Sequence, residues 1–175
     1  MASGKSTIGL ILANTLGWDF YDIDKVIEKK TGKSVKKIFA DEGEQYFREL
    51  ETKTLSELTN LQDCIIALGG GTIVSEVNLK IIKNSGFLVY LETSPEEAYR
   101  RLRFKRDRPV LLFEGKNEPT KEEFINKIKS ILEKRIEYYN QADIKINSDN
   151  SRIGNTVDRL EALIKKEFYG KKNNS

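Results

Sequence analysis

The sequence predicts an α/β fold in which a parallel sheet is flanked by helices, built as a single domain over residues 1–175. The short, continuous apolar run CIIAL is typical of a strand that is buried on both faces of a parallel sheet, and FLVYLET and IKIN are further strand-like runs. Between them lie segments whose apolar residues recur at three- and four-residue steps, which indicates helices. Strands that alternate with helices favour a parallel sheet. Neither a repeat nor a linker divides the sequence, and its length is near that of one typical domain.

In the first half of the chain, glycines and apolar spacing mark the helices. Gly17 and Gly32 each end a helix, because glycine accepts the left-handed conformation that closes one. A longer segment carries apolar residues at helical spacing from Phe47 to Leu61. The expected elements are a helix over 7–16, a strand-like run over 18–24, helices over 25–32 and 34–61, a strand over 64–68, a helix over 78–84 and a strand over 87–93.

In the second half, capping signals mark where helices begin. Ser94, Pro95 and Glu97 predict a capping box at the start of one helix, and Thr120 with Glu123 predicts another. The segment between these helices lacks regular periodicity, and connections of that length usually carry a function or move. The expected elements are a helix over 94–105, an irregular segment over 107–119, a helix over 122–139, a strand over 144–147, a helix over 156–168 and a frayed tail over 170–175.

Composition excludes several kinds of chemistry. The chain has no histidine, which removes imidazole bases, histidine zinc sites and Ser-His or Cys-His pairs. Its single cysteine, Cys64, lies in an apolar run and is expected to be a core residue rather than a nucleophile. Any catalysis must therefore use carboxylates, lysines, arginines and backbone amides, with or without a hard cation.

Charge and hydropathy patterning bear on partners and location. The net charge is +3, with basic and acidic residues interspersed, whereas nucleic-acid binders gather basic residues on one face. No stretch reaches the ~20 apolar residues of a membrane span, and the N-terminus lacks the pattern of a signal peptide. We therefore expect no nucleic-acid or membrane partner and a cytoplasmic location.

The opening residues, MASGKST, contain the second half of the phosphate-binding pattern G-x-x-x-x-G-K-[ST]. A Gly-Lys-Ser triplet at the start of a helix allows backbone N–H groups to bind an anion, aided by the helix dipole. Lys5 would then reach the β- and γ-phosphates of a nucleotide, and Ser6 would hold Mg²⁺. The alternative is an ordinary helix start. The first glycine of the pattern would fall before Met1.

Two acidic residues follow the first strand-like run. Asp22 and Asp24 are two positions apart, so in a strand both carboxylates point to the same face. They could hold a metal ion or take a proton from a hydroxyl group at the edge where α/β sheets bind ligands. The alternative is that Asp24 caps the next helix.

A helical pair and a run of glycines are further candidates. Arg48 and Glu51 are three residues apart on a helix and can pair, either as an exposed ion pair or to orient Arg48 toward a substrate carboxylate. The three glycines at 69–71 follow a strand directly, and so many flexible residues favour close approach of the backbone to a ligand over a plain tight turn. Arg108 and Arg135, taken alone, are ordinary surface arginines.

Together these motifs resemble the shikimate kinase family, within the nucleoside-monophosphate-kinase branch of the P-loop fold. The matching elements are GKST, DID, FRELE, ALGGGT, YLETSPE, the RP of DRPVLL and KRIEYYNQAD, in that order over residues 1–143. The resemblance implies a five-stranded parallel sheet and a lid, here about 104–120, that closes over ATP. It also implies Mg²⁺-dependent transfer of the γ-phosphoryl group of ATP to the 3-hydroxyl of shikimate, in aromatic amino-acid biosynthesis, by a monomer.

The resemblance further implies roles for individual residues. Asp24 would bind the attacking hydroxyl and act as its base, and Glu51 would orient Arg48. Arg101 would stack on adenine, and Arg108 would reach the phosphates from the lid. The implied groups are Lys5, Asp24 and Arg108 for catalysis; Asp24, Arg48, Glu51, Gly69, Gly70, Gly71 and Arg135 for shikimate; Ser3, Gly4, Lys5, Ser6, Thr7, Arg101 and Arg108 for ATP; and Ser6 and Asp22 for the metal.

The sequence departs from the family at its start. Family members carry an upstream strand, central in the sheet, and the first loop glycine. We expect that the chain as given begins inside the loop, that it is poorly folded or inactive as written, and that a version extended upstream is active. Two rival functions are a gluconate-kinase-like enzyme, which shares the P-loop and lid, and a nucleotide-binding module without catalysis.

Overall fold

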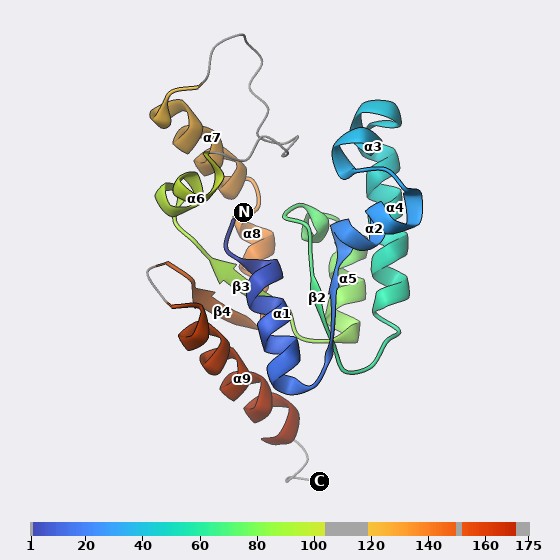
Figure 1. Ribbon diagram of the computed structural model, residues 1–175, viewed down its shortest axis with the longest axis vertical. Coiled ribbons are helices and arrows are strands. Elements are labelled where there is room, and N and C mark those ends of the chain that lie inside the picture. Colours follow the sequence, from blue (N-terminus) through green and yellow to red (C-terminus); the bar gives the residue numbers. More distant parts are fainter. Residues whose placement is uncertain (1, 104–118, 150–151, 171–175) are drawn as a thin grey trace.

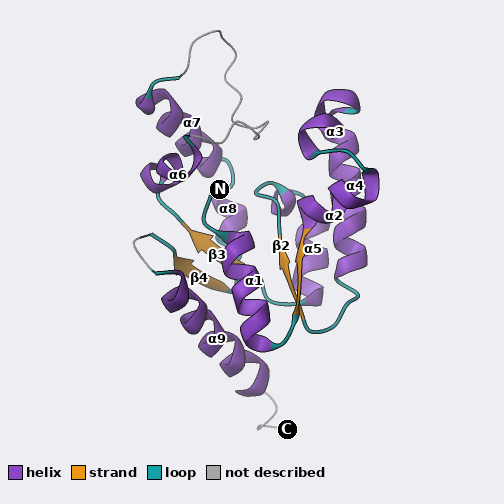
Figure 2. Cartoon of the chain, in the orientation of Figure 1, coloured by secondary structure: helices purple, strands orange, loops and turns teal. Residues whose placement is uncertain are grey.

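The computed structural model describes residues 2–103, 119–149 and 152–170. Helices and strands alternate through most of the chain (Figures 1 and 2). In order they are α1 (Lys5–Leu16), β1 (Asp19–Asp22), α2 (Ile23–Thr31), α3 (Val35–Asp41), α4 (Gly43–Leu58), β2 (Cys64–Ala67), a short 3-10 helix (Thr72–Val74), α5 (Glu76–Ser85), β3 (Val89–Glu92), α6 (Pro95–Leu102), α7 (Lys121–Glu133), α8 (Ile136–Tyr139), β4 (Ile144–Asn147) and α9 (Ile153–Gly170).

The four strands of the described residues form two parallel pairs. β1 pairs with β2, with Asp22 opposite Ala67, and β3 pairs with β4, with Glu92 opposite Asn147. The predicted α/β class with parallel strands and flanking helices is therefore confirmed. The described residues contribute four strands, in two separate two-stranded ladders.

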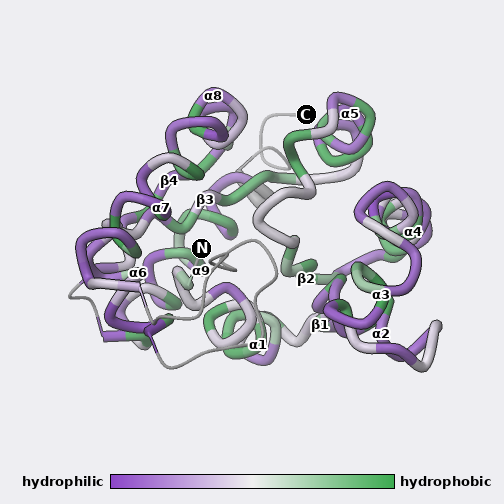
Figure 3. Tube along the Cα trace, turned by 90° about the horizontal axis from the view of Figure 1, so that it is seen from above, coloured by the Kyte–Doolittle hydropathy of each residue, from purple (hydrophilic) through white to green (hydrophobic). Residues whose placement is uncertain are grey.

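Helices cover both sides of the strands. Seen from above, β2 and β3 lie between α1 and α9 on one side and α5 and α8 on the other (Figure 3). One buried cluster, on the α1 and α9 side, includes Leu12, Ile146 and Leu160. A second, on the side of α2 to α5, includes Ile27, Phe47 and Leu55. Of the apolar residues at helical spacing from Phe47 to Leu61, Phe47 and Leu58 are buried as expected, whereas Leu61 lies beyond the end of α4 and is exposed.

An apolar cleft of about 330 Å³ lies where β2 and β3 face each other. It is lined by residues of both strands and by side chains of α1 and α9, such as Leu12 and Leu160. Cys64, at the start of β2, lines it too, and burial raises the pKa of its thiol. A raised pKa disfavours the thiolate, which agrees with a packing role for this cysteine.

Three predicted boundaries are wrong for local reasons. The helix over 34–61 is divided into α3 and α4, because Gly43 adopts a left-handed φ of 87°. The helix over 122–139 is divided into α7 and α8 at Arg135, whose φ is −117°. Asp24 lies in the first turn of α2, not in a strand.

The two predicted capping boxes have different outcomes. At Thr120 the box is complete, with reciprocal side-chain and backbone hydrogen bonds to Glu123. At Ser94 only half of the box forms: its hydroxyl accepts from the N–H of Glu97, but the Glu97 carboxylate binds Arg101 instead. The N–H of Ser94 that would complete the box donates to Asp149 Oδ2 at 2.8 Å instead.

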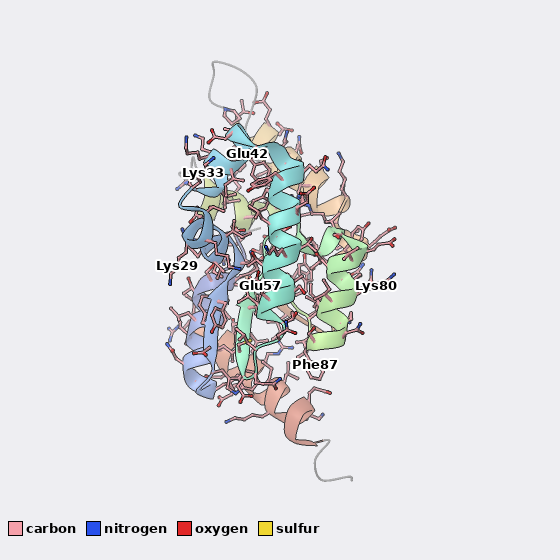
Figure 4. All side chains as sticks on the ribbon, turned by 90° about the vertical axis from the view of Figure 1, so that its right-hand side faces the viewer. Lys29, Lys33, Glu42, Glu57, Lys80 and Phe87 are labelled. Carbon is pink, nitrogen blue, oxygen red and sulfur yellow. The ribbon has the colours of Figure 1, made fainter. Side chains whose placement is uncertain are left out.

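The outer face of α2 to α5 carries charges of both signs (Figure 4). Lys33 pairs with Glu42 at 2.9 Å, and Lys30 pairs with Glu57. Exposed pairs of this kind stabilise a fold by only ~0.2–1 kcal/mol each. Among the described residues, no helix has both the length and the apolar character that crossing a bilayer demands.

Candidate active site

The start of α1 is shaped as an anion-binding turn. Gly4 caps the helix with a φ of 87°, and its carbonyl accepts the N–H of Ile8 at 2.8 Å. A side chain at this φ would be strained, and a Cβ would also lie 3.3 Å from Ile8 Cδ1. The glycine of GKST therefore allows the backbone N–H groups of the first turn, which begins at Lys5, to face a phosphate.

Ser6 and Asp22 meet beside this turn. The Ser6 hydroxyl donates to Asp22 Oδ2 at 2.5 Å. The other oxygen of Asp22 caps α2 by accepting the N–H groups of Asp24 at 3.1 Å and Lys25 at 3.4 Å. The capping role considered for Asp24 thus belongs to Asp22, because β1 ends at Asp22 and α2 begins with the next residue.

Asp24 reaches the glycine run from the first turn of α2. Its Oδ1 lies 3.4 Å from the point that a Cβ on Gly69 would occupy. The strand alternation that predicted its direction does not apply, since Asp24 is helical. The two carboxylates nevertheless flank one region, Asp22 at the phosphate turn and Asp24 at the glycines.

Arg48 is held by two carboxylates of its own helix. Its Nη1 donates to Glu51 Oε2 at 2.9 Å, and its Nη2 donates to Glu44 Oε1 at 2.9 Å. Burial of Arg48 acts to lower its pKa, but the hydrogen bonds with Glu51 and Glu44 outweigh burial and raise it. The Glu51 side chain is 1% exposed, so this contact is not the solvent-exposed ion pair that was the alternative.

Glu51 is fixed by residues that the sequence did not single out. Thr72 donates its hydroxyl to Glu51 Oε1 at 2.6 Å. Asn78 donates its side-chain N–H to the carbonyl of Thr72 at 2.9 Å. Both residues are buried. The position of Thr72 directly after the glycines was the one available signal, whereas the part played by Asn78 depends on how α5 packs.

The glycine run lies close to Arg48 and Glu51. A Cβ on Gly69 would lie 2.9 Å from Glu51 Oε1, and a Cβ on Gly71 would lie 2.9 Å from Arg48 Nη2. Real Cβ atoms essentially never approach so closely. These two glycines therefore make room for the ion pair of Arg48 and Glu51. A plain tight turn, the alternative considered for the glycine run, would not need that space.

On the other side of the run, Arg135 and Tyr139 bind one backbone oxygen. The carbonyl of Gly70 accepts Nη1 of Arg135 at 2.9 Å and the hydroxyl of Tyr139 at 2.7 Å. The Tyr139 ring stacks on Tyr90 of β3, with centroids 4.8 Å apart and planes 14° apart. Burial raises the pKa of Tyr90 to about 12. Sequence analysis named Arg135 but missed Tyr139.

The other residues expected to bind the nucleotide lie around the start of the chain. Ser3 is buried beside Gly4, and Thr7 is exposed on α1. Arg101 of α6 donates to the carbonyl of Ala2 at 2.9 Å and to that of Ser148 at 3.3 Å. Arg108 and nearly all of the predicted lid lie outside the described residues.

A small cavity joins the phosphate turn to the glycine run. It has a volume of about 60 Å³, and its lining includes Ser3, Lys5, Gly69, Gly70 and Tyr139. The start of α1, the turn after β2 and α8 lie toward the same end of the molecule in Figure 1. Of the predicted site residues that the structure describes, those of the phosphate turn and those of the glycine run therefore converge.

A phosphate-binding turn beside carboxylates and arginines, on parallel strands flanked by helices, defines a phosphotransferase of the P-loop class. The sequence model of the family described as shikimate kinase matches residues 1–165. The chain therefore belongs to the shikimate kinase family.

Individual relatives agree with this assignment. A shikimate kinase of Chlorobium limicola is 48% identical over 162 residues, covering 93% of this chain and 81% of the relative, and that of Chlorobium phaeobacteroides is 47% identical, covering 93% and 85%. Among solved structures, the shikimate kinase of Acinetobacter baumannii in complex with shikimate matches with a TM-score of 0.87 and 33% identity, covering 96% of this chain and 90% of that one. The enzyme of Bacteroides thetaiotaomicron matches with a TM-score of 0.84 and 35% identity, covering 94% of both chains.

Proposed function

We propose that this member of the family transfers the γ-phosphoryl group of ATP to the 3-hydroxyl of shikimate, with the residue roles given below. One observation carries the proposal: the glycine run contacts Arg48 and Glu51 on one side and Arg135 on the other, and shares a cavity with Lys5. A small anionic substrate seated at the glycines would therefore face the phosphate turn.

Two arginines bind the carboxylate of shikimate. Arginine suits this task because its planar guanidinium donates two parallel hydrogen bonds to a carboxylate. Glu51 holds Nη1 of Arg48, while the carbonyl of Gly70 holds Nη1 of Arg135. Each guanidinium is thereby oriented before the substrate arrives, which reduces the ordering cost of binding.

Asp24 receives the proton of the attacking hydroxyl, and Lys5 stabilises the charge on the phosphoryl group. Phosphoryl transfer depends on positioning and charge neutralisation rather than on covalent chemistry by the protein. Orientation of the hydroxyl in line with the phosphate can supply part of the ~7–11 kcal/mol available from proximity. The absence of histidine is therefore no handicap.

The residues at the phosphate turn fit a magnesium ion. Ser6 Oγ and Asp22 Oδ2 are both oxygen atoms and lie side by side, and Mg²⁺ is usually held by one or two carboxylates together with phosphate oxygens and water. Among the described residues, no cluster of three or more acidic or cysteine side chains forms a cage of its own. When bound, Mg²⁺ supplies charge neutralisation on the phosphates, with Ser6 and Asp22 as its protein partners.

Arg101 and the lid are further parts of the site that contact the nucleotide. Arg101 is tied to the start of the chain through Ala2 and to the end of β4 through Ser148, and we propose that its guanidinium stacks on adenine. Arg108 and the lid over about 104–120 then exclude water from the phosphoryl group. We further propose that the enzyme acts as a monomer in the cytoplasm.

The test compares residues 1–175 with the same residues preceded by an apolar strand that ends in glycine. Each version receives ATP, Mg²⁺ and shikimate, and ³¹P NMR detects shikimate 3-phosphate. We expect the extended version to be active, and the version that phosphorylates shikimate becomes the parent chain for variants. Asp24→Asn should lower kcat by at least about a hundredfold, the lower range for general acid-base catalysis. The proposal is wrong if neither version phosphorylates shikimate.

The same assay separates the rivals. Gluconate replaces shikimate in a second reaction, and phosphorylation of gluconate alone would identify the gluconate-kinase-like enzyme. Binding of ATP without transfer to either acid would identify a nucleotide-binding module.

A further inference from the structure

The carbonyl groups of the glycine run all accept hydrogen bonds within the protein. The oxygen of Gly69 accepts the N–H of Thr72 at 3.2 Å, and that of Gly71 accepts the N–H of Val74 at 3.1 Å. The oxygen of Gly70 accepts two donors, from Arg135 and Tyr139. Since a carbonyl oxygen has two lone pairs, the Gly70 oxygen is saturated.

The N–H groups of the same glycines, in contrast, are not engaged in backbone hydrogen bonds within the part of the chain that the structure describes. Among the described residues, the amides of Gly69, Gly70 and Gly71 donate no backbone hydrogen bond. A turn whose carbonyls are engaged and whose N–H groups are available attracts ligand atoms that carry negative charge. Gly69 and Gly70 line the same cavity as Lys5.

We propose that Tyr139 is a positioning residue for shikimate, a role that rests on the function proposed above: it holds the Gly70 peptide and Arg135 in the geometry that binds an anionic substrate. Arg135 alone would fill one lone pair of the Gly70 oxygen and leave the other open to water or to a ligand hydroxyl. The Tyr139 hydroxyl closes that position at 2.7 Å. Tyr139 acts through Gly70 and Arg135, and it needs no contact of its own with the substrate.

The position of the Tyr139 hydroxyl is set from two directions. The residue is 7% exposed, and its ring lies nearly parallel to Tyr90, so β3 fixes the plane of the ring. Its backbone N–H donates to the carbonyl of Arg135 at 3.0 Å, so one turn of α8 fixes the spacing between the two residues. The arginine, the tyrosine and the carbonyl therefore form one rigid group (the Gly70 clamp) that connects α8 to the turn after β2.

The test is Tyr139→Phe in the parent chain, since phenylalanine keeps the ring and removes only the hydroxyl. Loss of one net hydrogen bond corresponds to about a fivefold change in an equilibrium constant. We therefore expect KM for shikimate to rise about fivefold, with KM for ATP and kcat within about twofold of the parent. Tyr138→Phe, the same deletion one residue earlier, is the matched control and should leave both KM values unchanged.

A double-mutant cycle separates positioning from a general structural effect. If Tyr139 acts through Arg135, the fivefold effect should shrink to less than about twofold when both proteins also carry Arg135→Lys. An undiminished effect in that background overturns the proposal, and so does an equal rise in KM for ATP.

A measurement without turnover keeps this proposal distinct from the proposed function. Amide hydrogen exchange of Thr72 and Val74, whose N–H groups donate to carbonyls of the glycine run, should become about fivefold faster in Tyr139→Phe, while exchange in β2 stays unchanged. This result would support the Gly70 clamp even if neither version of the chain phosphorylated shikimate. Unchanged exchange at Thr72 and Val74, or faster exchange throughout the chain, would show that Tyr139 does not hold the glycine run.

Discussion

Glu51→Gln tests whether a buried carboxylate is what orients Arg48. Glu51 and Glu44 each lie 2.9 Å from a guanidinium nitrogen of this arginine, but their side chains are 1% and 65% exposed. Glutamine keeps the shape of the side chain and removes its charge. The substitution therefore changes the electrostatics of the pair and leaves the packing of α4 in place.

The expected loss of stability follows from these exposures. Breaking a fully buried ion pair costs ~3–5 kcal/mol. Here Arg48 is 32% exposed and retains Glu44, so we expect a smaller loss of about 2 kcal/mol, within the range for a hydrogen bond to a charged group. For a chain of this length that corresponds to a fall in Tm of about 4–8 °C. Glu44→Gln should cost at most about 1 kcal/mol, as an exposed pair does.

Two measurements test whether the buried carboxylate of Glu51 orients Arg48. Thermal unfolding followed by circular dichroism gives Tm for both variants, and the ³¹P NMR assay, run on the parent chain and on both variants, gives KM for shikimate and for ATP. In Glu51→Gln, KM for shikimate should rise about tenfold, equivalent to ~1.4 kcal/mol, while KM for ATP stays constant. Equal and small effects of the two substitutions would refute the argument that burial of Glu51 makes it the orienting partner.

Three further substitutions test the glycines, the metal pair and the pH dependence. Gly71→Ala introduces a Cβ 2.9 Å from the flexible end of Arg48. KM for shikimate should therefore rise about tenfold, while the free energy of unfolding changes by less than about 1 kcal/mol. A large fall in Tm with an unchanged KM would contradict this reasoning. Ser6→Ala removes the hydroxyl that contacts Asp22, and the kinase assay should then need about tenfold more Mg²⁺ for half-maximal rate, whereas an unchanged Mg²⁺ titration would exclude Ser6 as a ligand. Burial acts to raise the pKa of Asp143, but hydrogen bonds from Lys83 and from the N–H of Leu88 outweigh it and hold that pKa below its usual value. A depressed pKa in the folded state stabilises the protein above the unfolded-state pKa, and this stability is lost as the pH falls through the folded-state pKa. The free energy of unfolding should therefore drop between about pH 5 and pH 2, and Asp143→Asn should flatten that drop in urea titrations, unlike the exposed control Asp158→Asn.

Sequence patterns predicted the parts of the fold that depend on neighbouring residues. Gly17 and Gly32 end their helices in the left-handed conformation, and Thr120 forms its capping box. Gly43 was overlooked because the apolar spacing of the helix over 34–61 continues across it. The helix start at GKST was equally local, since Gly4 caps α1 in the left-handed conformation.

The supporting residues of the site were much harder to predict. Thr72, Asn78 and Tyr139 are ordinary residue types whose roles come from tertiary contacts with Glu51 and Gly70. No spacing rule connects residues so far apart in the sequence. Asp24 illustrates a different lesson: it lies beside Gly69, but the alternation argument used to direct its side chain does not apply to a helix.

The break between the two strand pairs affects how the halves of the site are aligned. Most groups proposed for shikimate attach to the β1–β2 pair and its helices, whereas Arg135 leads into α8 and β4 and Arg101 follows β3. Within the described residues, no backbone ladder fixes one pair against the other. Their relative placement instead depends on the hydrogen bonds of Arg135 and Tyr139 to Gly70, and on side-chain packing around α1, where Ile8 and Leu12 meet residues of β2, β3 and β4 in one cluster. Trimming Leu12 would thus act on the alignment of Arg135 with Arg48 as well as on the alignment of acceptor and donor.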